Sequence, residues 1–206
     1  MKILFQGDSI TDCGRGTGLG QGYPLLISAR LGLDAPGKHE FLNFGISGNR
    51  VVDVYARIKK DGWNHNPDVF SILIGINDVW HELGGGNGVE ADRFYTVLKM
   101  LADDTIARFP GIRMIFMEPF TLNTGVVAEN WDYFREETAL RGAAVKRVAE
   151  EVGGLYLPLQ EKFNAACETC DASYWLRDGV HPTPAGHQLI ADAWLALFER
   201  EILGES

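Results

Sequence analysis

A serine near the start of the chain and a histidine near its end have the residue types of an activated nucleophile and its base. Ser9 stands in the string Gly-Asp-Ser-Ile, and His181 stands three positions after Asp178. A histidine can take the proton of a serine hydroxyl, and a carboxylate can hold the ring in the tautomer that this transfer needs. The order Ser…Asp…His therefore predicts acyl transfer through a covalent serine intermediate. The second glycine of a G-x-S-x-G turn is missing, which argues against the commoner hydrolase layouts.

Two polar segments that contain glycine lie between these motifs. Gly48 falls in the string Gly-Ile-Ser-Gly-Asn, and Asn77 falls in Gly-Ile-Asn-Asp. The tetrahedral intermediate of acyl transfer carries an oxyanion that needs hydrogen-bond donors. The candidate donors are the backbone N–H groups of Ser9 and Gly48 and the side-chain amide of Asn77. Gly48 has no side chain that could block an approaching oxyanion.

Strand-like and helical patterns alternate along the chain and must position these motifs. The expected strands are short apolar runs at 2–6, 41–44, 69–74, 112–117 and 155–157. The expected helices cover 22–33, 51–60, 91–109, 131–152 and about 185–202. This alternation predicts an α/β domain with a parallel sheet and helices on both faces. No linker or repeat is visible, so we expect a single domain over residues 1–206, with residues 84–86 as a local loop.

Each polar motif follows an expected strand. The segments that contain Ser9, Gly48 and Asn77 come directly after the first, second and third expected strands, and the segment 178–181 follows the last strand by a longer loop. In open parallel sheets, ligand sites form beyond the carboxyl ends of the strands. We therefore expect the four segments to converge on one edge of the sheet.

Four strings in this order resemble the sequence blocks of the SGNH (GDSL-type) hydrolases. They are Gly7-Asp8-Ser9-Ile10, Gly48 within its turn, Gly75-x-Asn77-Asp78 and Asp178-x-x-His181. The resemblance extends from residue 5 to residue 187. It implies a three-layer flavodoxin-like fold with a central five-stranded parallel sheet. It also implies Ser9 as nucleophile, an oxyanion hole formed by Ser9, Gly48 and Asn77, and an ester substrate.

Longer strings resemble one branch of that superfamily, the intracellular carbohydrate acetylesterases, which include bacterial acetyl-xylooligosaccharide esterases. These strings are Gly7–Arg15, Gly45–Asn49, Ile74–Trp80 and Val180–His187. The resemblance implies a small-molecule ester substrate, an acetylated sugar. The acyl-enzyme route predicted above needs no metal and no cofactor. Two alternatives stay open: a longer-chain acylhydrolase such as a lysophospholipase or thioesterase, and a catalytically silent binding module.

Aromatic and basic residues near the motifs are candidates for binding the sugar. Trp80 and Trp175 flank the expected catalytic turns and could stack on a sugar ring. Arg15 and Arg50 lie near the same turns and could bond hydroxyl groups. By contrast, Asp8 and Asp78 have no required chemical step, so we expect them to bond loop amides.

The remaining histidines and the cysteines are expected outside the chemistry. We expect His187 to be a packing or capping residue near the start of the last helix. The other histidines are expected at the surface or in loops: His39, His65 and His81. The pair Cys167-x-x-Cys170 has no second pair beside it, so we interpret it as incidental rather than as a metal or redox site.

The charge balance disfavours two classes of partner. The 206 residues carry 19 Lys plus Arg and 28 Asp plus Glu, a net charge of −9, which argues against nucleic acid and anionic membranes. The apolar stretch after Lys2 is too short for a signal peptide, and three cysteines are an odd number for a disulfide framework. We therefore expect a cytoplasmic protein. A homo-oligomer is an open alternative, with Leu25, Trp175 or the last helix as candidate contacts.

Overall fold

The computed structural model describes residues 1–204, and within them five parallel strands form one central sheet. The strands are β1 (Lys2–Gly7), β2 (Glu40–Asn43), β3 (Val69–Leu73), β4 (Arg113–Met117) and β5 (Leu155–Leu157). Their order in the sheet is β2-β1-β3-β4-β5. This is the flavodoxin-like order, in which the chain reverses its direction of winding between β1 and β3. The predicted fold class is confirmed, and the observed strands differ from the expected ranges by only one residue at either end.

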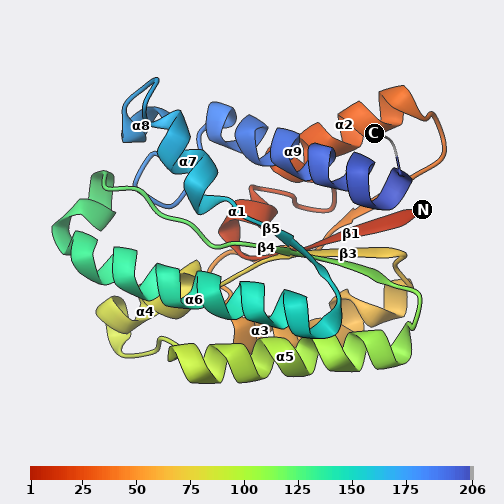
Figure 1. The fold of residues 1–206 in the computed structure, drawn as a ribbon, viewed down its shortest axis with the longest axis horizontal. Helices are drawn as coiled ribbons and strands as arrows, with labels where there is room; N and C mark the ends of the chain where they lie inside the picture. Colours follow the sequence, from red (N-terminus) through yellow and green to blue (C-terminus); the bar gives the residue numbers. More distant parts are fainter. Residues whose placement is uncertain (205–206) are drawn as a thin grey trace.

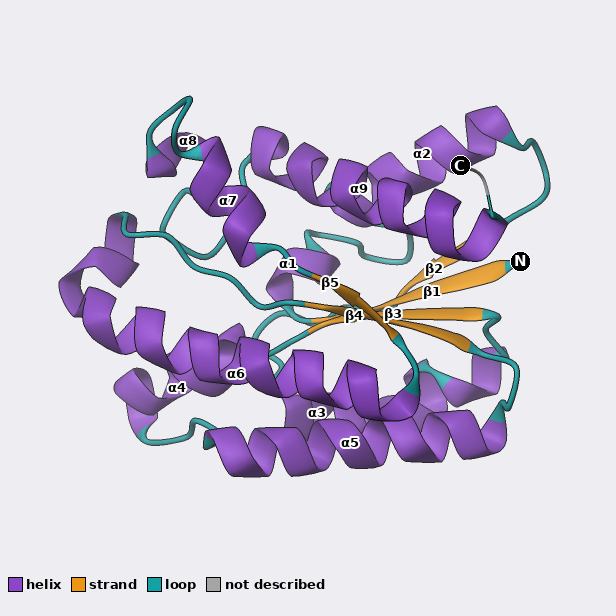
Figure 2. Cartoon of the chain, in the orientation of Figure 1, coloured by secondary structure: helices purple, strands orange, loops and turns teal. Residues whose placement is uncertain are grey.

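Helices cover both faces of the sheet (Figures 1 and 2). On one face, α2 (Tyr23–Asp34) packs beside α9 (Pro184–Phe198). On the other face lie α3 (Val51–Asp61), α5 (Ala91–Arg108) and α6 (Trp131–Val152). Within residues 1–204, no helix combines the length and the apolar character that crossing a bilayer requires.

Residues of β1 and β3 alternate between the two faces of the sheet and are almost all buried on both. Ile3 and Phe5 belong to the core under α2 and α9, whereas Leu4 belongs to the core under α3 and α5. When helices cover both faces of a strand, the residues on both faces are apolar, and the sequence of the strand is a continuous apolar run. Trp194 of α9 is fully buried, and its Nε1 donates a hydrogen bond to Ser71 Oγ in β3 at 3.0 Å. This bond satisfies the buried indole and fixes α9 against the middle of the sheet.

The structure contains short elements that the sequence patterns did not predict. They are α1 (Ser9–Asp12), α4 (Ile76–Gly85), α7 (Gln160–Ala166), α8 (Ala172–Trp175), the 3₁₀ turns Trp63–His65 and Gly125–Asn130, and a π-helical turn at Glu199–Leu203. The expected loop at residues 84–86 is wrong in part, because Gly84 and Gly85 are the last residues of α4. The expected C-terminal helix ends as an α-helix at Phe198 and continues as the π-helical turn.

Candidate active site

Ser9 is the first residue of α1, directly after β1. Asp8 caps this helix, since its Oδ1 accepts a hydrogen bond from the Ile10 N–H at 3.0 Å. The first N–H groups of a helix have no acceptor within the helix, so the Ser9 N–H is available to a ligand. The Oγ of Ser9 lies 2.8 Å from Nε2 of His181.

The turn from Asp178 to His181 fixes the imidazole ring on its Nδ1 side, opposite Ser9. Nδ1 of His181 lies 2.7 Å from Asp178 Oδ2, and Asp178 Oδ1 accepts the backbone N–H groups of His181 at 2.8 Å and Val180 at 3.0 Å. Burial alone would raise the pKa of Asp178, but these hydrogen bonds outweigh burial and hold the pKa below its usual value. An ionised carboxylate favours the ring proton on Nδ1, which leaves Nε2 as the acceptor that faces Ser9.

Contacts with the segment after β4 bring this turn to the same sheet edge as Ser9. A short antiparallel bridge between Leu176 and Pro182 closes the turn. Gly179 has a φ of +93°, a conformation that favours glycine. Its carbonyl accepts the Leu122 N–H at 3.0 Å and the Thr121 hydroxyl at 2.9 Å. The turn therefore keeps its position through the backbone of its own glycine.

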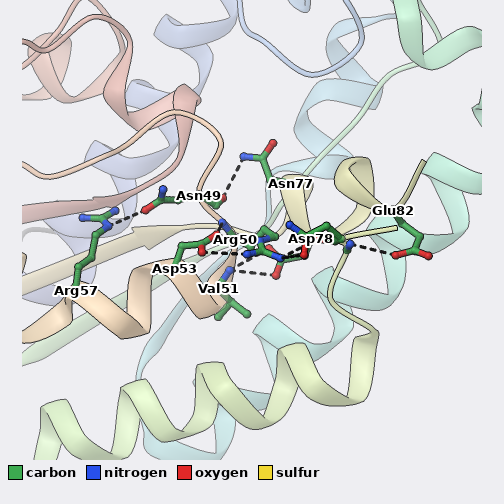
Figure 3. A network of polar contacts seen from close by, with 10 residues as sticks. Asn49, Arg50, Val51, Asp53, Arg57, Asn77, Asp78 and Glu82 are labelled. Atoms are coloured by element: carbon green, nitrogen blue, oxygen red, sulfur yellow. Dashed lines mark hydrogen bonds and ion pairs between the residues drawn. The ribbon is translucent and has the colours of Figure 1, made fainter. Parts of the chain in front are cut away.

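Gly48 and Asn77, the other two expected donors, lie beside Ser9 in the lining of one pocket. Gly48 has a φ of +81°, and a Cβ built there would meet no heavy atom within 4 Å, so its backbone conformation rather than crowding within the protein favours glycine. Asn77 is 7% exposed and lies in the first turn of α4. Its Nδ2 donates to the Asn49 carbonyl at 3.1 Å (Figure 3). A side-chain amide carries two N–H groups, so one remains free to face a ligand.

These residues line a pocket of about 660 Å³. Its lining residues are Ser9, Ser47, Gly48, Asn77, Trp80, His81, Gly84, Gly85, Asn87 and His181. The ring of Trp80 lies 6.0 Å from that of His181. The residues that α4 contributes are spaced as one face of a helix, because Trp80, His81 and Gly84 follow Asn77 at the third, fourth and seventh positions.

The sequence matches the GDSL-like lipase/acylhydrolase family over residues 5–189. The chain belongs to this family. It is 37% identical over 207 residues to an acetylxylan esterase from Geobacillus stearothermophilus, covering 94% of this chain and 92% of that one. The solved structure of Axe2, an acetylxylan esterase from the same organism, has a TM-score of 0.85 and 36% identity, covering 95% of this chain and 92% of that one. A putative GDSL-like lipase from Parabacteroides merdae has a TM-score of 0.89 and 36% identity, covering 95% and 94% of the two chains.

The family and its esterase relative make this chain a carboxylic ester hydrolase. The resemblance of the four sequence blocks to SGNH hydrolases is confirmed, as is the fold that the resemblance implied. Thr121 and Leu122, which follow β4, belong to no such block. Their hydrogen bonds to the Gly179 carbonyl become visible only in the folded acylhydrolase.

The sequence predicts His81 at the surface or in a loop, and its side chain is partly exposed, but the residue is helical rather than in a loop. His81 is in α4 and lines the pocket of the acylhydrolase. Burial lowers the pKa of His81, and the nearby Arg50 guanidinium adds to this effect. A signal for His81 was present in the sequence, since four positions from Asn77 is one helical turn. It could be used only once the segment after Gly75 was known to be a helix.

Three of the residues expected to bind substrate do not line this pocket in the described chain. Arg15 donates through Nε to the Gly45 carbonyl at 2.6 Å. Arg50 pairs with Asp53 at 2.9 Å and donates to Asn87. Trp175 lines a separate cavity between α7 and α9. The Nε of Arg15 and the guanidinium of Arg50 thus bond within the protein. The expected substrate contacts of Arg15, Arg50 and Trp175 stay predictions, as does that of Trp80, which lines the pocket.

Asp8 and Asp78 are almost completely buried, at 1% and 0% exposed. The expected bonds to loop amides are present: Asp8 accepts the Ile10 N–H, and Asp78 accepts the Val51 N–H at 3.1 and 3.2 Å. Burial raises the pKa of each carboxyl to about 7. The two carboxyl groups also interact, since the charge of Asp8 contributes to the raised pKa of Asp78.

The three cysteines are free thiols. Burial raises the pKa of Cys167, and the charges of Asp171 and Cys170 add to this effect. Within residues 1–204, no three His, Cys, Asp or Glu side chains form a group that could hold a metal ion. The pair Cys167 and Cys170 lies beyond α7 and lines neither the pocket at Ser9 nor the cavity at Trp175.

Proposed function

We propose that this acylhydrolase is a serine esterase that removes O-acetyl groups from small carbohydrates. The observation that carries the proposal is the hydrogen-bonded line from Asp178 through His181 to Ser9 Oγ, which ends in the pocket. Solved structures of Axe2 add support, because three of them are described as catalytic mutants in which a serine, an aspartate or a histidine is replaced by alanine. In that enzyme the aspartate precedes the histidine by three positions, as Asp178 precedes His181 in this chain.

In the proposed first step, Ser9 Oγ attacks the ester carbonyl carbon while Nε2 of His181 takes the hydroxyl proton. The carbonyl oxygen becomes an oxyanion, for which the N–H groups of Ser9 and Gly48 and the amide of Asn77 are the donors. The bond to the leaving oxygen then breaks, and His181 returns its proton to the alcohol. In the second step, His181 activates a water molecule that attacks the acetyl-serine, and acetate leaves.

The residues that line the pocket favour a short acyl group and a polar alcohol. Trp80 is the single large apolar side chain among the lining residues of the described chain, whereas Ser47, His81 and Asn87 offer polar atoms. A long acyl chain would need a continuous apolar wall, while a sugar ring uses an aromatic face together with a few polar groups. The 37% identity to an acetylxylan esterase supports the same choice.

A series of p-nitrophenyl esters from acetate to decanoate tests the acyl preference. We expect the highest kcat/KM on acetate and a fall of at least about tenfold by octanoate, since the lining offers few apolar contacts to a long chain. A maximum at octanoate or longer would replace the proposed acetylesterase by a longer-chain acylhydrolase.

Ser9→Ala tests the proposed nucleophile. We expect kcat to fall by about 10³-fold or more, because loss of the nucleophile leaves only the contribution of binding and the oxyanion donors. The matched control is Ser28→Ala, which changes a serine of α2 that bonds only to its own helix at Leu25. Equal hydrolysis of p-nitrophenyl acetate with and without Ser9 would favour a binding module instead.

The leaving alcohol is best identified with acetylated xylo-, manno- and chito-oligosaccharides of defined acetylation. Acetate release followed by proton NMR reports both the rate and the position of the sugar that is deacetylated. We expect the fastest release from acetylated xylo-oligosaccharides, in line with the acetylxylan esterase relative. Release from none of the three sugars, with p-nitrophenyl acetate still hydrolysed, would contradict the carbohydrate substrate but not the esterase.

A further inference from the structure

We infer that Arg57 is a positioning residue for the oxyanion hole. The inference rests on the proposed function, since it takes Ser9, Gly48 and Asn77 as the oxyanion donors. Arg57 lies in α3, its side chain is only 15% exposed, and it does not line the pocket. It therefore acts on the donors through other residues rather than by touching the substrate.

The guanidinium of Arg57 donates to four acceptors that come from three parts of the chain. Nη2 donates to the Gly7 carbonyl at 3.3 Å, and Nη1 donates to the Phe44 carbonyl at 2.8 Å. Nε donates to Asn49 Oδ1 at 2.7 Å. Nη1 also bonds to Asp61 Oδ2 at 3.2 Å, one turn along the same helix. A planar guanidinium with donors in fixed directions can hold these groups together, which a lysine ammonium cannot.

Three of these bonds reach the segments that present backbone donors. Gly7 is the last residue of β1 and stands two positions before Ser9. Residues 44 and 49, both bonded by Arg57, lie on either side of Gly48 in the turn after β2. Arg57 therefore fixes the ends of β1 and β2 at the point where the proposed N–H donors leave the sheet.

The bond to Asn49 also leads to the side-chain donor. Figure 3 shows Arg57 bonded to Asn49, and Asn49 bonded in turn to Asn77. The Asn49 carbonyl accepts one N–H of the Asn77 amide at 3.1 Å, and this bond sets the direction of the other N–H. A single guanidinium thus touches, or lies one residue away from, every segment with a proposed donor.

Accurate placement matters because oxyanion donors stabilise a charge that exists only in the transition state. A misplacement of about 1 Å can lower the rate of an enzyme by about 10²-fold. A merely structural Arg57 would change stability and leave kcat alone. A positioning Arg57 would lower kcat with little change in KM, because the ground-state ester does not yet carry the oxyanion.

The test compares Arg57→Gln, Arg57→Lys and Asn49→Ala with the parent enzyme. The measurements are kcat and KM on p-nitrophenyl acetate, the inhibition constant of a short alkyl boronic acid that mimics the tetrahedral intermediate, and thermal unfolding. We expect kcat to fall about 10²-fold in Arg57→Gln and about tenfold in Asn49→Ala, with KM within about threefold. The affinity for the boronic acid should fall by similar factors. The kcat of Arg57→Lys should lie between those of Arg57→Gln and the parent.

Two controls separate positioning from loss of stability. Trp63→Phe removes a hydrogen bond of 2.9 Å from Trp63 Nε1 to Thr105, close to α3 but away from the pocket. Arg147→Gln removes an exposed arginine that pairs with Glu151 one turn along α6. Both variants should keep kcat within about twofold, even where Trp63→Phe lowers the unfolding temperature.

The outcomes distinguish this inference from the proposed function. A folded Arg57→Gln with unchanged kcat and unchanged boronic acid affinity would overturn the inference, and so would an unchanged Asn49→Ala if Arg57→Gln does not fold. The kcat of the combined variant of Asn49→Ala and Arg57→Lys should fall by less than the product of the two single decreases, since both changes act on the bond between Arg57 and Asn49.

If Asn77→Ala lowers kcat while the Arg57 and Asn49 variants do not, only the inference about Arg57 fails. If Asn77→Ala is fully active, the proposed oxyanion hole fails with it.

Discussion

Nδ1 of His187 accepts a hydrogen bond from the backbone N–H of Tyr23 at 3.2 Å. This bond places the ring proton on Nε2, which lies 3.5 Å from Cys13 Sγ. The histidine therefore donates toward Cys13 and does not act as a base for its thiol, which leaves Ser9 as the proposed nucleophile. His187 does cap a helix, but it caps α2, which begins at Tyr23, rather than the helix α9 that contains it.

The contact with Tyr23 predicts how stability depends on pH. Burial lowers the pKa of His187 from 6.5 to about 4. Below about pH 6.5 the unfolded chain takes up a proton that the folded chain does not. The free energy of unfolding therefore falls as the pH falls, by about 1.5 kcal/mol between pH 6.5 and 5. His187→Gln keeps an acceptor for Tyr23 and does not titrate. In urea unfolding, the free energy of unfolding of this variant relative to that of the parent should therefore be higher at pH 5 than at pH 7.5. A difference that stays constant from pH 5 to 7.5 would contradict the prediction.

Asn77→Ala should remove one oxyanion donor. We expect kcat on p-nitrophenyl acetate to fall by about 10²- to 10³-fold, equivalent to about 3–4 kcal/mol, while KM changes little. The matched control is Asn164→Ala in α7, whose side chain accepts a hydrogen bond from Gln160 at 3.0 Å away from the pocket. Equal losses in kcat for both variants would mean that the effect of Asn77→Ala is not specific to the donor.

The buried carboxyl of Asp8 predicts a pH effect of the opposite sign. Its pKa rises from 3.8 to about 7 because it is buried, so the folded chain holds a proton that the unfolded chain has released. Stability from this group is therefore lost as the pH rises from about 4 through 7. Asp8→Asn keeps an oxygen that can accept the Ile10 N–H and removes the ionisation. As the pH rises from 5 to 8, the free energy of unfolding of the variant should increase by about 2–3 kcal/mol relative to that of the parent. If the free energies of unfolding of the two proteins differ by the same amount at every pH, the carboxyl of Asp8 does not have a raised pKa.

The pocket face of α4 predicts a residue that discriminates among alcohols. His81→Ala should raise KM for an acetylated xylo-oligosaccharide by about tenfold, the loss of roughly one hydrogen bond. The same variant should keep kcat/KM for p-nitrophenyl acetate within about threefold, because that ester has no sugar. Trp175→Phe, which changes a residue of the separate cavity, is the control and should leave both substrates unaffected. Equal loss on both substrates would argue that His81 supports the fold of the pocket and does not contact the sugar.

The elements with long-range periodicity could be predicted closely from the sequence. Helix α6 has the expected bounds, Trp131 to Val152, because its apolar positions repeat over six turns and a glycine pair follows it. The convergence of Ser9, Gly48 and Asn77 could also be predicted, since the carboxyl ends of neighbouring parallel strands share one edge of the sheet.

Helix α4 could not be predicted in this way. Gly75 precedes it, Gly84 and Gly85 end it, and glycine has a low helix propensity. The Asp78 carboxyl in its first turn accepts the Val51 N–H of α3, a tertiary contact that no local pattern reveals. The acceptors of Arg15 and Arg50 are equally invisible, because a basic residue near a motif does not show which carbonyl it faces. The cytoplasmic location and the homo-oligomer stay predictions.

The bond between Ser9 Oγ and His181 Nε2 joins residues 172 positions apart. During translation, the proposed nucleophile Ser9 therefore leaves the ribosome long before the proposed base His181. All five strands end at Leu157, so a growing chain of that length would hold the whole sheet and, on the proposed mechanism, would lack hydrolytic activity. Ester hydrolysis is thus a sharper measure of complete folding than helix or strand content. Fraying of the segment around His181 would switch the enzyme off while the sheet remained intact.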